Sequence, residues 1–202
     1  MKTHKIAGID YSLTSPAVTI YHGNRWNYNN VEHYCIANNT SQMGRWSAIQ
    51  NVKVTLYESW TDALERYEFL ADWVIHNLLY ANFNKTVNIP YDKPDLVVLE
   101  DYAYAATGRV FHIAENMAIL KYKLKKHGVK YIIVPPTVIK KFATGKGTAN
   151  KDLMYENFCE ETKTKINLTI SPKSDTIKNP TSDIVDSYYI CKYGYNNLTI
   201  TK

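Results

Sequence analysis

The chain has 202 residues, of which 45% are hydrophobic and 21% are charged. This balance is typical of one globular domain and excludes a disordered tail or linker. No apolar run approaches the length needed to cross a bilayer, so a membrane-spanning protein is excluded as well. The formal net charge of +5 is compatible with a polyanionic partner but is too small to identify one.

The cysteines and the N-terminal residues indicate the compartment. The three cysteines are odd in number and lack the paired spacing of a zinc site, so neither a disulfide framework nor structural zinc is expected. The chain runs into a strand-like block without the apolar stretch of a secretory signal. Both features predict a protein of the reducing cytoplasm.

The first part of the chain has the pattern of a small antiparallel sheet. Apolar blocks at residues 5–10 and 17–21 flank the turn-prone segment 12–16, which predicts a β-hairpin. A third strand is expected at residues 31–36. Residues 37–60 are polar, with scattered aromatic residues and no clear period, and they predict a long loop or an insertion.

A helix and a buried strand are predicted next. Thr61 or Asp62 would cap the helix at its N-terminus. Its core-facing stripe at helical spacing consists of Leu64, Tyr67, Phe69, Leu70, Trp73, Val74, Asn77 and Leu78. Residues 95–100 then form a short continuous apolar run, typical of a parallel strand that is covered on both faces.

The second half alternates helices with one more strand. A helix is expected over residues 109–127 with Gly128 as its stop, followed by a strand at 130–134. Two further helices are expected, from Thr148 or Asn150 through Cys159 and from Thr181 or Ser182 through about Tyr193, on either side of the polar segment 163–180. The pattern predicts an α/β fold in a single domain spanning residues 1–202.

Four carboxylates stand where this fold would bring them together. Asp10 and Glu100 end two predicted central strands, and active sites form at that edge of a sheet. Asp183 and Asp186 are three residues apart at the start of the last helix, so both can point at the same spot. Magnesium prefers such hard oxygen ligands, and four converging acids suit a two-metal phosphodiester site.

Each acid alone has a purely structural explanation. Asp10 precedes a turn and is explained as a turn former, whereas Glu100 would be a solvated edge residue. Asp183 would interact with the helix dipole. Only the set of four points to a specific chemistry.

The three acidic segments resemble, in order, the motifs of RuvC-type DNA-junction resolvases. They are Ile9-Asp10-Tyr11-Ser12-Leu13-Thr14-Ser15-Pro16, Val98-Leu99-Glu100 and Asp183-Ile184-Val185-Asp186-Ser187. The resemblance covers nearly the whole chain. It implies an RNase H-like fold: a five-stranded mixed sheet, with antiparallel strands 1–3 and parallel strands 4 and 5, flanked by helices.

The resemblance also implies a function. The chain would be a magnesium-dependent endonuclease acting on branched DNA, especially four-way (Holliday) junctions, by paired nicks that leave a 5′-phosphate. Asp10 would bridge two Mg²⁺ ions, for which Mn²⁺ would substitute, and Glu100, Asp183 and Asp186 would complete the ligands. A homodimer would place one site on each symmetry-related strand. The cytoplasm would be that of a bacterium or of a phage-infected host.

Basic and aromatic residues complete the predicted site. Lys140 and Lys151 correspond to family lysines near the cleaved phosphate, where a cation would stabilise the transition state. Arg109, Lys141 and Lys146 belong to a basic stretch, residues 107–151, that would contact DNA phosphates. Ordinary surface lysines would explain the same pattern.

The sequence departs from the family at two places. Tyr11 stands where the family commonly has a glycine, and residues 24–60 are longer than the usual connection. Ala103 occupies the position of the family's junction-opening aromatic residue, flanked by Tyr102 and Tyr104. Either tyrosine would stack on a base, or the pair would anchor a loop.

Three rival functions share these acids. A nuclease of the same fold could act instead on flaps, forks or RNA–DNA hybrids. An ATPase of the actin type would need two large domains and phosphate-binding glycines, which 202 residues with Tyr11-Ser12 after Asp10 do not supply. A non-catalytic DNA-structure-binding module would not need all four acids.

Overall fold

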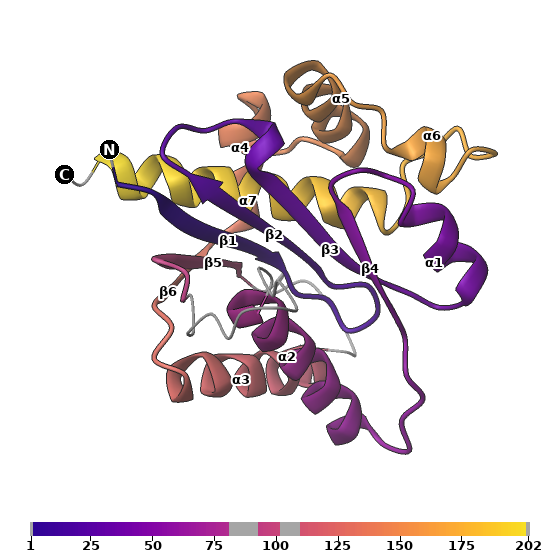
Figure 1. The fold of residues 1–202 in the computed structure, drawn as a ribbon, viewed down its shortest axis with the longest axis vertical. Helices are drawn as coiled ribbons and strands as arrows, with labels where there is room; N and C mark the ends of the chain where they lie inside the picture. Colours follow the sequence, from indigo (N-terminus) through magenta and orange to yellow (C-terminus); the bar gives the residue numbers. More distant parts are fainter. Residues whose placement is uncertain (1, 81–92, 102–109, 201–202) are drawn as a thin grey trace, which may run out of the picture.

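The computed structural model describes residues 2–80, 93–101 and 110–200. Its centre is a six-stranded mixed sheet with the order β4-β3-β2-β1-β5-β6 (Figure 1). Strand β2 pairs antiparallel with both β1 and β3, whereas β5 and β6 continue the sheet in parallel with β1 and β4 continues it in parallel with β3. The strands are β1 (His4–Asp10), β2 (Ala17–Gly23), β3 (Val31–Ala37), β4 (Val52–Leu56), β5 (Leu96–Glu100) and β6 (Tyr131–Val134).

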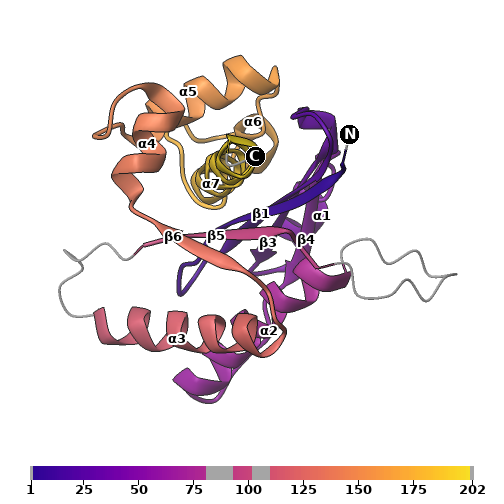
Figure 2. The same cartoon turned by 90° about the vertical axis from the view of Figure 1, so that its left-hand side faces the viewer.

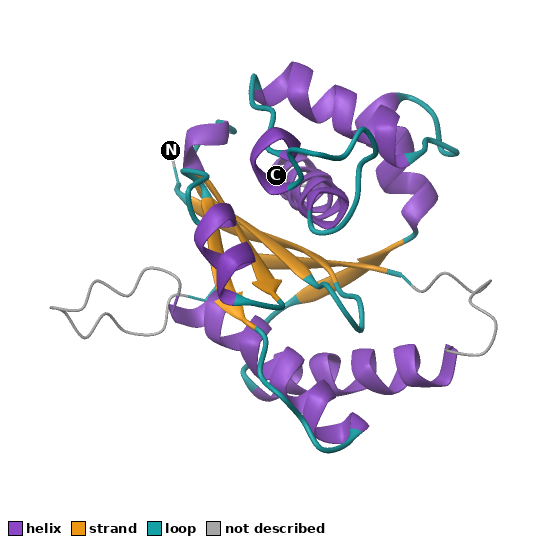
Figure 3. Ribbon diagram, turned by 90° about the vertical axis from the view of Figure 1, so that its right-hand side faces the viewer, coloured by secondary structure: helices purple, strands orange, loops and turns teal. Residues whose placement is uncertain are grey.

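Helices cover both faces of this sheet (Figures 2 and 3). They are α1 (Thr40–Trp46), α2 (Ala63–Tyr80), α3 (Val110–Lys126), α4 (Pro136–Thr144), α5 (Lys151–Thr162), α6 (Asn167–Ile170) and α7 (Thr181–Ile200). One face packs on α7 with α4, α5, α6 and α1 nearby, and the other packs on α2 and α3. No helix within the described ranges is both long and apolar enough to span a bilayer.

The alternation of side chains along a strand divides them between the two layers. In β1, Ile6 belongs to the α7 layer, while Ala7 and Ile9 belong to the α2–α3 layer. In β5, Val98 faces the α7 layer and Leu99 the opposite one. Strand β5 is covered on both faces, as its apolar run predicts.

Helix α7 lies directly against strand β1 because Gly8 has no side chain. A Cβ atom built on Gly8 would lie 2.1 Å from the Cys191 amide nitrogen and 2.4 Å from the Ser187 carbonyl oxygen. Further along the same contact, a Cβ atom on Gly194 would lie 2.6 Å from Val98 Cγ2. These two glycines let the helix backbone approach the sheet, and the approach fixes which turn of α7 faces which strand residue.

The fold class agrees with the prediction, but four local features differ. Residues 37–60, predicted as a loop or insertion, contain helix α1 and strand β4, which pairs in parallel with β3 and raises the strand number from five to six. Helix α4, which begins at Pro136, was not predicted, and α7 continues to Ile200 instead of ending near Tyr193. Leu64 is 63% exposed and is not part of the core stripe.

Candidate active site

Strand pairing places Asp10 beside Glu100. The parallel register pairs Ile9 of β1 with Leu99 of β5, so the next residue in each strand is an acid. By the alternation along each strand, Asp10 lies on the same face as Ile6 and Glu100 on the same face as Val98, which is the α7 face. The carboxyl ends of the two central strands therefore present two neighbouring acids to one helix.

The N-terminal turns of α7 bring the other two acids. Gly8 meets the backbone at Ser187 and Cys191, and Asp10 lies two residues further along β1 in the direction of the helix N-terminus. Asp183 and Asp186 occupy the preceding turn of α7. We refer to Asp10, Glu100, Asp183 and Asp186 as the acidic site, since their charges interact with one another.

Burial raises the pKa of every carboxyl group in the acidic site, and repulsion by neighbouring acids raises the pKa of Asp10, Glu100 and Asp186 further. Desolvation, followed by the charges of Asp183, Glu100 and Asp186, raises the pKa of Asp10 well above its usual value. Desolvation and the Asp186 charge raise the pKa of Glu100 to about 7. Desolvation and the Asp183 charge raise the pKa of Asp186 to about 6, and burial also raises that of Asp183. The site thus concentrates negative charge that the protein only partly offsets.

Two lysines partly balance the negative charge of the acidic site. The positive charge of Lys140, on α4, lowers the pKa values of Glu100 and Asp186. Lys151, the first residue of α5, acts in the same direction on Asp10, Asp183 and Asp186. The structure therefore brings together all six residues predicted for catalysis or metal binding, from two strands and three helices.

Hydroxyl groups orient Asp183 and Lys151. Ser15 Oγ donates a hydrogen bond of 2.6 Å to Asp183 Oδ2. Lys151 Nζ donates to Ser182 Oγ at 3.1 Å and to Asn179 Oδ1 at 3.3 Å. Such bonds fix a buried carboxylate and a long lysine side chain in one orientation.

A neutral polar cluster lies next to the acidic site on the same face of the sheet. Thr19 Oγ1 lies 2.8 Å from His33 Nδ1 and 2.7 Å from Ser187 Oγ, and Ser187 Oγ donates to the Ile184 carbonyl oxygen at 2.9 Å. Since the Ser187 hydrogen is used, Thr19 donates to Ser187 and accepts from His33. Burial lowers the pKa of His33 to about 3, so the imidazole is neutral.

The acidic site fits divalent metal ions by its chemistry. Buried carboxylates whose repulsion raises their pKa values are hard oxygen ligands that a cation would stabilise. Among the residues that the structure describes, no three His, Cys, Asp or Glu side chains are placed so that they could together hold a metal ion. Magnesium in general uses few carboxylates and completes its coordination with water and substrate phosphate.

The residues predicted to bind DNA divide into two groups. Tyr102, Tyr104 and Arg109 lie outside the described residues. Lys141 and Lys146 are exposed, and Lys141 lines a shallow cavity of about 430 Å³ beside Phe142. In the same basic stretch, Lys123 is held by Asp72 at 2.6 Å and by Glu68, so its charge is already balanced.

The sequence motifs include Ser15 and Ser187, and Ser182 was expected at the start of the last helix, but none of the three was assigned a role in the site, and neither were Thr19 and His33. Ser15 lies in the turn directly after Asp10, and Ser182 directly precedes Asp183. The position of these two serines next to the acidic residues was the signal in the sequence that could have assigned them to the site. For Thr19 and His33 the sequence contains no such signal, because only the register of the sheet brings them to α7.

Comparisons with known proteins concern the fold. No family model matches the sequence, and no curated protein matches it. The structure is similar to RuvC of Thermus thermophilus, with a TM-score of 0.57 and 13% identity over 96% of both chains. It is also similar to T. thermophilus RuvC in complex with a Holliday junction substrate, with a TM-score of 0.60 and 12% identity over 97% of both chains. At this identity, the likeness shows that the chain has the fold of RuvC.

Proposed function

We propose that this chain is a metal-dependent endonuclease that cleaves branched DNA, with the four-way junction as its preferred substrate. One observation carries the proposal: four buried or half-buried carboxylates with raised pKa values converge at the carboxyl edge of a RuvC-type sheet, with Lys140 and Lys151 beside them. The likeness to a structure that contains a Holliday junction substrate supports the choice of DNA.

Each group has a defined task in this proposal. Asp10, Glu100, Asp183 and Asp186 would hold two Mg²⁺ ions, or Mn²⁺ in their place. Bound there, the ions would activate a water for in-line attack and stabilise the leaving oxygen, giving a 5′-phosphate. Lys140 and Lys151 would stabilise the charge on the attacked phosphate. Lys141, Lys146, Tyr102, Tyr104 and Arg109 would contact the DNA.

A homodimer would allow paired nicks on symmetric strands of the junction. The outer surface of α3 supports a subunit interface there. Phe111 is 79% exposed and Tyr122 is 66% exposed. They are eleven residues apart, which places them on one side of the helix. Light scattering of the purified protein, with Phe111→Glu as the variant, would test the interface.

Two alternatives use the same site. A nuclease acting on flaps, forks or RNA–DNA hybrids would need the same four acids. A binding module would not need them, and burying them together costs stability, so the acidic site favours an enzyme.

Cleavage of labelled DNA tests the proposal. The substrates are a four-way junction, a fork, a flap, an RNA–DNA hybrid and a linear duplex, each in magnesium and in EDTA. We expect paired, symmetric nicks in the junction that disappear in EDTA. Preference for another substrate would support the first alternative, and tight binding without cutting would support the second.

A further inference from the structure

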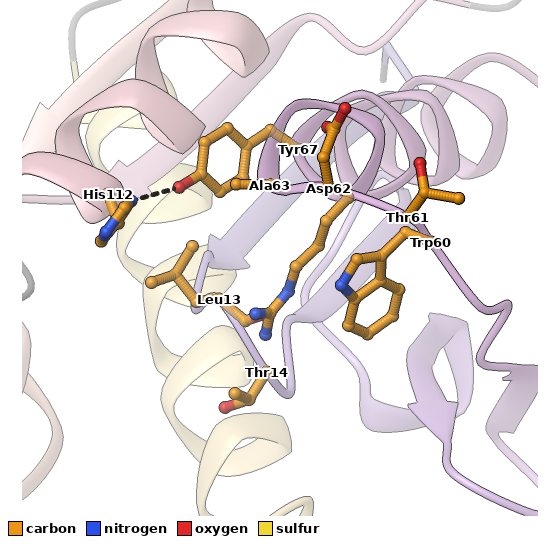
Figure 4. Close-up of a pocket in the computed structure, with 9 residues that line it drawn as sticks. Leu13, Thr14, Trp60, Thr61, Asp62, Ala63, Tyr67 and His112 are labelled. Carbon is orange, nitrogen blue, oxygen red and sulfur yellow. Dashed lines mark hydrogen bonds between the residues drawn. The ribbon is translucent and has the colours of Figure 1, made fainter.

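A second cavity, of about 540 Å³, lies on the α2–α3 side of the molecule, next to the turn that follows β1 (Figure 4). Three segments that are distant in the sequence form it: this turn, residues 60–67 around the start of α2, and the start of α3. Its lining consists of Leu13, Thr14, Trp60, Thr61, Asp62, Ala63, Arg66, Tyr67 and His112. The volume is in the range of sites that bind small organic groups.

Arg66 ties one wall of the cavity to the turn. Its guanidinium group donates to the Leu13 carbonyl oxygen, and its Nε donates to Tyr57 Oη at 3.3 Å. The guanidinium carbon also lies 4.8 Å from the centre of the Trp60 ring system. Trp60 is nevertheless 37% exposed. The wall thus offers a planar cation and an accessible indole, both of which stack on flat aromatic groups.

The opposite wall is polar. Tyr67 Oη lies 2.8 Å from His112 Nδ1, and in Figure 4 this pair and Trp60 lie on opposite sides of the cavity. Asp62 is fixed at the start of α2, where its Oδ1 accepts hydrogen bonds from the amides of Leu64 at 2.7 Å and Glu65 at 2.9 Å. A flat group stacked inside would therefore meet donors and acceptors at its edge.

The cavity and the acidic site share one turn. Thr14 lines the cavity, and the next residue, Ser15, donates to Asp183. Ser12 Oγ accepts the Ser15 amide at 2.9 Å, which closes the turn. A nucleotide in the cavity would therefore belong to the DNA strand whose phosphate lies at the acidic site, or to a strand immediately beside it.

We propose that this cavity binds an unpaired nucleobase of the branched DNA, close to the phosphate that is cut. This proposal rests on the proposed function. A base has the flat faces that Trp60 and Arg66 would stack on, and the edge groups that His112 and Asp62 would bond. A base inside a duplex is stacked and paired and cannot enter, so the cavity selects a strand opened at the branch point.

The first experiment locates the base. The fluorescent base 2-aminopurine is placed at one position after another around the branch of a four-way junction, and the non-cutting variant Asp10→Asn is added. We expect the fluorescence to change at one position near the cleavage point when the base enters the cavity, and that change to be lost in Trp60→Ala. A signal that is the same in both proteins at every position would overturn the proposal.

The second experiment measures the contribution of the base. Removing that base from the junction should weaken binding about 5- to 100-fold, and Trp60→Ala should cause a similar loss on the intact junction. Combining the two changes should add little, because both remove the same contact. Losses that multiply in full would show that Trp60 and the base act separately, which would overturn the proposal.

Two further variants separate the cavity from general effects on folding. Leu64→Ala is the matched control, since Leu64 is 63% exposed at the start of the same helix and does not line the cavity. His112→Ala alters the opposite wall and should weaken binding of the intact junction but not of the junction without the base. Magnesium-dependent cleavage with no sensitivity to Trp60, His112 or any single base would overturn this proposal and leave the proposed function intact. Failure to bind any branched DNA would overturn both.

Discussion

Two groups of buried polar residues lie side by side on the α7 face of the sheet, and they are built in opposite ways. In the neutral cluster, Thr19, His33 and Ser187 exchange hydrogen bonds of 2.7 and 2.8 Å and carry no charge. In the adjacent acidic site, burial raises the pKa of each acid, and repulsion adds to the rise for Asp10, Glu100 and Asp186. The first arrangement pairs its hydroxyl groups and His33 Nδ1 with one another and leaves His33 Nε2 without a partner, whereas the second holds like charges that Lys140 and Lys151 only partly offset.

The difference distinguishes residues that stabilise the fold from residues that are retained for a function. Satisfied buried hydrogen bonds contribute to stability, and the neutral cluster links β2, β3 and α7. Buried like charges lower stability, so their retention at one spot indicates a function. Substitutions in the two groups should therefore affect stability and cleavage in different proportions.

The largest expected effect is on cleavage. Asp10→Asn replaces the Asp10 carboxylate with a neutral amide of nearly the same size. We expect the rate of junction cleavage to fall about 100-fold or more, since ligands of catalytic metal ions contribute several kcal/mol to the transition state. Single-turnover assays in magnesium would measure it, with binding of uncut junction as the control. A variant that cuts at the wild-type rate would exclude Asp10 from catalysis.

The next largest effect is expected from a substitution that disrupts both the neutral cluster and the acidic site. Gly8→Ala would place a methyl group 2.1 Å from the Cys191 amide nitrogen, so α7 would have to move away from β1. We expect a loss of about 3 kcal/mol or more in the free energy of unfolding, together with loss of cleavage. Urea unfolding would show it. Gly44→Ala is the matched control, because nothing lies within 4 Å of its Cβ position.

A smaller effect is expected from the neutral cluster. Thr19→Val keeps the side-chain shape but leaves His33 Nδ1 and Ser187 Oγ without their shared partner. The free energy of unfolding should fall by about 1–3 kcal/mol. Thermal unfolding would measure the loss. Cleavage by the protein that remains folded should change little, and a loss as large as that of Asp10→Asn would mean that the two groups are not separate.

The smallest expected effect is a gain in the free energy of unfolding, not a loss. Because the pKa of Asp186 rises from 3.8 to about 6 on folding, the folded state holds this proton more tightly. The stability that the folded protein gains from binding this proton is complete below about pH 4 and is lost as the pH rises through about 6. At higher pH, Asp186→Asn should therefore make the metal-free protein about 1–2 kcal/mol more stable than the wild type. Thermal unfolding in EDTA across this range would detect a difference that grows with pH; a constant difference would contradict it.

The sequence predicted the acidic site better than its surroundings. Asp10 and Glu100 end apolar strands, and Asp183 and Asp186 begin a helix, so local patterns and the rules of parallel sheets were sufficient to bring them together. The RuvC-like motifs added Lys140 and Lys151, which the structure places beside the acids.

Short elements were not predicted. In α1, which has seven residues, only Trp46 is buried. Helix α4 has nine residues, and although Ile139, Phe142 and Ala143 pack on the core, the run is too short to give a sustained helical period. Strand β4 pairs only with β3 among the described strands and carries Lys53 in its short run. The cavity at Trp60 was also missed, since its walls come from segments that only the tertiary fold brings together.

The central claim is that the acidic site is destabilised in order to bind metal ions. The most direct test compares the unfolding temperatures of the wild type and Asp186→Asn at about pH 8, in EDTA and in millimolar magnesium or manganese. We predict that the variant is more stable in EDTA, and that metal raises the wild-type midpoint more than that of the variant, because only the intact site binds the ions in full. Equal responses of the two proteins to metal, or a variant that is less stable in EDTA, would contradict the account.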